Sequence, residues 1–195
     1  MGTANADLIL AGVSAGGTSG LELLWVAPLG TTLPTDADST LNGAFESIGY
    51  VTADGATLAQ SRSTNDVEVY GSITPARKLV SKSSKTWEIT GAETSPTVLE
   101  LYNQLELGSI VPDANGKFTI APSSLEVTRY AFVLVVVDGE NVIRYAAGNC
   151  EVTDVKERKV ANGTPLTYGM TITPYPDANG IPVHEHYLIP ALAGS

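Results

Sequence analysis

A short glycine-rich stretch contains a serine in a pattern that could do nucleophilic chemistry. Gly12–Gly16 reads GVSAG, which matches the Gly-x-Ser-x-Gly turn that presents a nucleophilic serine between a strand and a helix. The residues that follow, GTSG, are poor helix formers, and only His184 and His186 could act as the base. We therefore interpret the stretch as a flexible Ser/Gly segment, and a serine hydrolase remains a weak alternative.

The two histidines and the single cysteine suggest little further chemistry. His184 and His186 would lie on one face of an extended strand, but no nearby Cys or Asp completes a set of metal ligands. Cys150 stands beside Glu151 and lacks the basic neighbours that lower the pKa of a thiol, so we expect a buried filler. The sequence therefore predicts no catalytic residue, no metal and no cofactor.

Four of the 11 basic residues gather in one stretch of an acidic chain. The net charge is −10, and ARKLVSKSSK contains four cations, namely Arg77, Lys78, Lys82 and Lys85. Alone, the stretch could hold an anion, but in so acidic a chain pairing with carboxylates of a neighbouring copy is favoured. No larger basic patch exists to grip phosphates, so specific nucleic-acid binding is not expected.

The secondary structure predicted around these residues consists mainly of strands. Alternation places Leu166, Tyr168, Met170 and Ile172 on one face, and in KTWEITG it points Trp87 and Ile89 inward. The run FVLVVV is typical of a strand buried on both faces, and the Asp138-Gly139 pair after it predicts a hairpin. Turns are also predicted at Asp54-Gly55 and at the two copies of PDANG, which we interpret as one turn used twice.

Two stretches have helical spacing. SPTVLELYNQLEL offers Ser95 as the N-cap, Pro96 at the first helical position, and apolar residues on one side at Val98, Leu101, Tyr102 and Leu105. DSTLNGAFESIG, residues 38–49, is a weaker candidate because Asn42-Gly43 interrupts it.

One apolar stretch is rich in Pro, Gly and Thr, namely LWVAPLGTTLPTD at residues 24–36. It has no charged residue before Asp36, which is unusual for a surface loop. We predict that an adjacent subunit or its own sheet covers it, with Trp25 and Leu29 as anchors of an interface. The interface candidates in this stretch are Leu24, Trp25, Val26, Pro28 and Leu29. A core strand followed by an ordinary loop remains the alternative.

No convincing linker divides the chain. We expect a flexible N-terminal arm over residues 1–20, a single β domain over 21–188 and a C-terminal tail over 189–195. No stretch approaches the length of a membrane span, and no signal peptide is recognised, so synthesis in a cytoplasm is expected.

Several pieces of the chain, in colinear order, resemble one protein family. They are VAPLGTTLPT (26–35), AFESIGYVTADGATLAQSRSTNDVEVYG (44–71), TVLELYN (97–103) and residues 130–177, which end in ANG.P..Y...IT.YPD. In this order they resemble the major tail proteins, or tail tube proteins, of phages with long non-contractile tails, most similar to those that infect actinobacteria.

The resemblance implies a mainly β fold, a sandwich or barrel with one flanking helix and a long hairpin. It implies hexameric rings stacked into a tail tube in the virion, assembled in the host cytoplasm, through which double-stranded DNA passes without specific binding. Further implied partners are the tape-measure, tail-tip and tail-terminator proteins. A membrane is not among the implied partners. Ser63–Ser72 would belong to the hairpin and reach the next ring through Asp66, Glu68 and Tyr70. A head–tail connector or terminator, or a non-viral β-sandwich binding module, remains an alternative.

Overall fold

The structure, a computed structural model, describes residue 10, residues 23–122 and residues 127–193. Most of the expected N-terminal arm, including GVSAG, lies outside the described residues. The elements, in chain order, are β1 (Leu24–Pro28), β2 (Glu46–Ser47), β3 (Val51–Val67), β4 (Arg77–Gly91), α1 (Pro96–Tyr102), β5 (Arg129–Asp138), β6 (Asn141–Val155), β7 (Tyr168–Pro174), β8 (His184–Leu188) and the 3-10 turn η2 (Pro190–Leu192).

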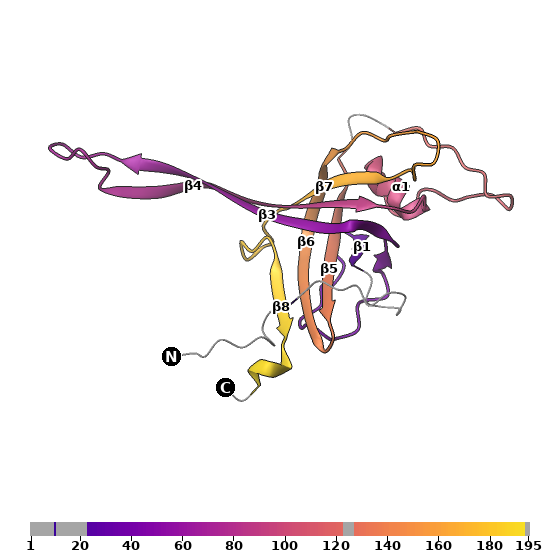
Figure 1. Ribbon diagram of the computed structural model, residues 1–195, viewed down its shortest axis with the longest axis horizontal. Coiled ribbons are helices and arrows are strands. Elements are labelled where there is room, and N and C mark those ends of the chain that lie inside the picture. Colours follow the sequence, from indigo (N-terminus) through magenta and orange to yellow (C-terminus); the bar gives the residue numbers. More distant parts are fainter. Residues whose placement is uncertain (1–9, 11–22, 123–126, 194–195) are drawn as a thin grey trace.

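All the strands described belong to one antiparallel sheet. The strand order is β2-β1-β5-β6-β7-β4-β3, and β8 pairs with β6 outside this path. The long strand β6 makes this branch possible, because its first half, Val142–Ala146, pairs with β8 and its second half, Cys150–Val155, pairs with β7. Figure 1 shows β5 and β6 side by side in the body, with β3 and β4 crossing it and extending far beyond it.

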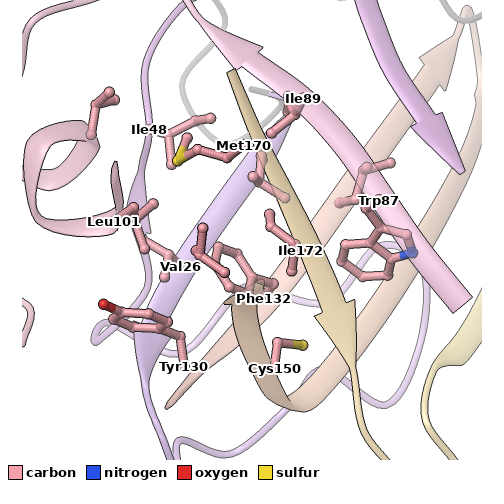
Figure 2. Packing of buried hydrophobic residues seen from close by; sticks show 14 of the residues in the cluster. Val26, Ile48, Trp87, Ile89, Leu101, Tyr130, Phe132, Cys150, Met170 and Ile172 are labelled. Atoms are coloured by element: carbon pink, nitrogen blue, oxygen red, sulfur yellow. The ribbon is translucent and has the colours of Figure 1, made fainter. Parts of the chain in front are cut away.

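The sheet curls around its main core. Val26 of β1 and Trp87 of β4 lie far apart in the strand order, yet both belong to the same buried cluster as Phe132 of β5. Leu101 brings α1 into this cluster, and Figure 2 shows these side chains converging from the strands and the helix. The mainly β fold is therefore confirmed, and its single curled sheet corresponds to the barrel-like form of the expectation.

Strand β5 is buried on both faces, as FVLVVV predicted. Its even-numbered residues, Tyr130, Phe132 and Leu134, enter the main core. Its odd-numbered residues from Ala131 to Val137 enter a second cluster on the other face. This second face is covered by the loop over residues 29–45, through the side chains of Leu33, Leu41 and Phe45.

The stronger helix prediction is confirmed. α1 begins at Pro96, and the Ser95 Oγ accepts a hydrogen bond from the Val98 N at 3.3 Å. The helix ends at Tyr102, so Leu105, which was expected on its apolar side, lies beyond it and packs against the core from the following loop.

The weaker helix prediction is wrong. Within residues 38–49 the structure has a turn, in which the Phe45 N donates to the Asn42 carbonyl at 2.9 Å, followed by the two-residue strand β2. Phe45 and Ile48 are both buried, but in the two clusters on opposite faces of the sheet. A helix would place them on one side, so an extended segment is the conformation that buries both.

The two PDANG turns are built in the same way, which confirms the interpretation of one turn used twice. The Asp113 Oδ1 accepts from the Asn115 N and the Lys117 N, both at 2.8 Å. The Asp177 Oδ1 accepts from the Asn179 N at 2.8 Å and the Ile181 N at 2.9 Å. Gly116 and Gly180 both have positive φ, at 76° and 79°, which glycine adopts without strain.

Two smaller predictions need correction. Asp54-Gly55 is an irregularity inside β3, where the register to β4 shifts between Val51 and Ala56, and not a turn between two strands. Leu166 precedes β7 and is 36 % exposed, so the predicted alternation holds only from Tyr168 onward.

Candidate assembly surface

The most prominent surface is a hairpin that no other part of the described chain covers. β3 and β4 stay paired from Thr57↔Glu88 outward to Val67↔Arg77, and residues 57–84 are all exposed. We call residues 57–86 the long hairpin, and residues 68–76 its tip. Figure 1 shows the long hairpin projecting from the body. A hairpin alone in water is marginally stable at best, so its length and exposure indicate a surface that meets another molecule.

The outer part of the long hairpin is apolar. Tyr70 and Ile73 at the tip are 107 % and 106 % exposed. Further exposed apolar side chains in this part are Val67, Val69, Leu79 and Val80. Such a concentration of exposed apolar side chains is typical of a protein–protein contact.

A β-bulge divides the basic cluster between the two faces of the long hairpin. The register shifts between Ser63↔Lys82 and Thr64↔Val80, which leaves Ser81 as the extra residue. Side chains alternate along each strand, so this shift places Arg77 and Lys82 on one face and Lys78 and Lys85 on the other.

Only one of these two faces has its cations paired within the chain. The Lys78 Nζ lies 3.3 Å from the Asp66 Oδ1, and the Lys85 Nζ lies 2.9 Å from the Glu185 Oε1 in β8. Hydrogen bonding from Lys85 lowers the pKa of Glu185, which keeps this carboxylate charged. Arg77 and Lys82 form no ion pair with the described residues. Pairing with a neighbouring copy therefore stays a prediction for Arg77 and Lys82, whereas Lys78 and Lys85 already have partners.

The predicted inter-ring residues lie at the outer end of the long hairpin. Asp66 is in β3 opposite Lys78, while Glu68 and Tyr70 follow in the tip. Glu68 forms no hydrogen bond or ion pair with the described residues, so its carboxylate is available to a partner.

The apolar stretch at residues 24–36 divides between core and surface. Leu24 and Val26 are fully buried in the main core, so for these two residues the core alternative describes the structure. Trp25 is partly buried against the second cluster. Pro28 and Leu29 are exposed, Leu29 to 54 %, and they are the part of the stretch that another subunit could contact.

The structure shows the surroundings of the cysteine and the two histidines that were considered above for catalysis or metal binding. Cys150 is fully buried, and burial raises the pKa of its thiol to about 12, so it is the predicted filler. His184 and His186 lie on one face of β8 with parallel rings 6.5 Å apart. Among the described residues no group of three or more His, Cys, Asp or Glu could hold a metal ion. The structure also places Asp177 beside these histidines, a contact that the sequence analysis did not predict. The Asp177 Oδ2 lies 3.0 Å from the His184 Nε2.

Two buried charged residues were missed by sequence reasoning. Glu100 is 1 % exposed, and its carboxylate accepts from the Gly108 N at 3.0 Å and the Ile110 N at 2.7 Å. Arg144 is 5 % exposed and its Nη1 donates to the Ser39 carbonyl, which ties the loop of residues 29–45 to β6. Burial lowers the pKa of Arg144. In both cases the sequence held a clue to burial, because the charged residue stands within a run of apolar residues.

No helix within the described residues is long and apolar enough to cross a membrane.

Comparisons with known proteins give matches among solved structures and a match to a family model. The solved structures that match this chain include two of gene transfer agent particles, whereas no curated protein matches the sequence significantly. One is the virion of a native gene transfer agent particle, at 11 % identity and a TM-score of 0.42, covering 85 % of this chain and 95 % of that chain. The other is the tail of an empty gene transfer agent particle with C6 symmetry, at 14 % identity and a TM-score of 0.37, covering 80 % of this chain and 92 % of that chain.

A family model gives the more direct assignment. The model described as phage tail tube protein matches residues 14–187, which include every strand described above except the last residue of β8. The chain therefore belongs to the phage tail tube protein family.

Proposed function

We propose that this protein assembles into hexameric rings that stack into the tail tube of a phage with a long non-contractile tail, and that the tube conducts the genome into the host. Proteins of this family are structural components of the virion tail, and the chain is not an enzyme. Hexameric rings and stacking follow from the resemblance described above. Within the tail, the tape-measure, tail-tip and tail-terminator proteins are the other proposed partners.

The long hairpin is the observation that supports self-assembly most directly. Its residues 57–84 are exposed on both faces, and its apolar outer part is not covered by the described chain. In a monomer this strand pair would be an aggregation hazard, whereas in a polymer it joins copies. A contact between a projecting hairpin and a different surface of the next copy is head-to-tail, and such contacts generate either closed rings or open, repeating assemblies.

The charge distribution supports a role as a conduit for DNA. The long hairpin carries five basic and two acidic residues, a formal charge of +3. Because the net charge of the whole chain is −10, the rest of the chain has a formal charge of −13. Acidic walls repel phosphates and offer DNA no binding positions. The body is therefore suited to the passage of DNA without specific binding.

Electron microscopy of the purified protein tests this function. Concentrated protein is expected to form long hollow tubes of stacked six-membered rings. The double variant Tyr70→Ser/Ile73→Ser should remain a folded monomer, because both side chains are fully exposed, yet lose tube formation. Circular dichroism melting curves of both proteins serve as the control for folding.

Other assemblies would contradict the proposal. Single rings that never stack would identify a terminator or connector, because such proteins cap a tube. A monomer at every concentration would remove self-assembly altogether.

A further inference from the structure

A groove lies at the root of the long hairpin, where β3 and β4 leave the body. Its volume is about 530 Å³, within the range of specific binding sites. One wall is polar and comes from the hairpin, with Arg62, Ser83 and Lys85 among its residues. The other wall is the end of β7 and the loop between β7 and β8, which contribute apolar residues, namely Pro174, Tyr175, Pro176, Ile181, Pro182 and Val183. In Figure 1 this loop lies beside the root of the hairpin.

The groove is held in shape by contacts within the chain. The second PDANG turn fixes the loop, and the Asp177 side chain also contacts His184 of β8 at 3.0 Å. The Lys85–Glu185 ion pair fixes the position of β8 relative to the hairpin. The Arg129 guanidinium lies 5.4 Å from the centre of the Tyr175 ring. A preformed groove binds a partner without a further cost of ordering its own walls.

We infer that this groove receives the tip of the long hairpin from a second copy of the chain. This inference rests on the proposed function and names the surface that accepts the hairpin. Tyr70 and Ile73 are apolar and fully exposed, and the proline-rich wall offers them an apolar surface. Glu68 beside them has no partner among the described residues, and Arg62 in the groove forms no ion pair there.

The geometry makes this contact intermolecular. Lys85 at the groove lies eight positions along β4 from Arg77, which directly follows the tip. At about 3.3 Å per residue this is roughly 26 Å, so a straight strand pair cannot return its tip to its own root. The hairpin of one copy would instead reach the groove of the next copy, and the two copies would be spaced by at least about 26 Å along the hairpin.

Cysteine cross-linking in assembled tubes tests the inference. Ser72→Cys marks the tip and leaves Tyr70 and Ile73 in place, and Ser83→Cys marks the groove. The native Cys150 is buried and should not react. With a short bismaleimide, tubes of the double variant Ser72→Cys/Ser83→Cys should give a ladder of covalent oligomers on a denaturing gel.

A matched variant serves as the control. Ser72→Cys/Ser109→Cys carries its second thiol at an exposed position in the loop after α1, and it should give no ladder. Tubes that form normally but cross-link no better through Ser83→Cys than through Ser109→Cys would overturn the groove assignment and leave the proposed function standing. Failure of the unmodified protein to form tubes would overturn the proposed function and this inference together.

Discussion

Glu100 is a single buried carboxylate that fixes the path of a loop. It lies on α1 among the apolar residues Val98, Leu99 and Leu101, and its two oxygens accept from backbone N–H groups at Gly108 and Ile110. A buried charge is tolerated when hydrogen bonds compensate for the loss of water. The side chain therefore stabilises the turn that returns the chain from the helix.

Replacing this carboxylate should weaken the fold. Glu100→Ala leaves two backbone donors without a partner, so we expect the free energy of unfolding to fall by roughly 2–4 kcal/mol. Urea unfolding followed by circular dichroism measures the change. The control Glu106→Ala alters an exposed residue in the same loop and should change stability by less than about 0.5 kcal/mol. Equal effects of the two substitutions would contradict this role.

The aspartates of the two PDANG turns should make the free energy of unfolding depend on pH. A hydrogen bond from the backbone N–H of Lys117 lowers the pKa of Asp113 below its usual 3.8. The pKa of Asp177 is lowered in the same way by a hydrogen bond from the backbone N–H of Ile181, and further by the side chain of His184. The native pKa is below the unfolded one, so each group stabilises the fold above pH 3.8 and this contribution is lost as the pH falls through the lowered native pKa.

Replacing one of these aspartates should reduce the acid sensitivity. Asp177→Asn keeps an oxygen acceptor but cannot titrate, so its stability should fall less steeply than that of the unmodified protein as the pH is lowered below 3.8. Urea midpoints measured across this range test the expectation. Asp154→Asn, at an exposed strand position outside the turns, should behave like the unmodified protein. Identical pH profiles for Asp177→Asn and the unmodified protein would count against it.

At the scale of the element, the β-bulge decides what the long hairpin presents to a partner. Without the bulge at Ser81, regular alternation along β4 would place Lys82 on the same face as Lys78. With it, Arg77 and Lys82 share a face with the exposed apolar residues Val67 and Leu79. The result is one face that combines unpaired cations with apolar side chains, which suits an acidic and partly apolar surface of a neighbour.

Reversing the charge of this face should impair assembly. For Arg77→Glu/Lys82→Glu we expect the critical concentration for tube formation to rise at least about tenfold, because the two cations would no longer face acids of a neighbouring copy. Sedimentation of assembled material measures this concentration, and the monomer should unfold as before. The double variant Lys117→Glu/Lys159→Glu makes the same charge change at exposed positions off the hairpin. A similar loss of assembly in this control would show a general effect of net charge.

At the scale of the whole molecule, charge is separated between hairpin and body. A projecting element of formal charge +3 beside a body of −13 favours contacts between the hairpin of one copy and the body of another. Copies that approach body to body repel one another. The separation therefore favours the head-to-tail contacts that a tube requires over disordered aggregation.

Salt should slow the first steps of assembly. Attraction between exposed charges is screened beyond about 8 Å at physiological ionic strength, so the initial rate of tube formation should fall as sodium chloride is raised from about 50 to 500 mM. Light scattering after a concentration jump follows this rate. A rate independent of salt would mean that apolar contacts alone bring the copies together.

Much of the fold, and the family, could be predicted from the amino-acid sequence. Period-two alternation and the FVLVVV run identified strands around Trp87, Phe132 and Met170, and Ser95-Pro96 located the start of α1. These predictions succeeded because they depend on local spacing and on capping chemistry. The colinear resemblance identified the tail tube family for the same reason, since it also depends only on residues in order.

Features that depend on partners far away in the chain could not be predicted in this way. Residues 38–49 are extended because the sheet offers a cluster on each face for Phe45 and Ile48. Lys85 meets Glu185 because β8 returns to the root of the long hairpin. Which cations stay unpaired depends on one bulge and on a strand about a hundred residues away, and neither is encoded in local spacing.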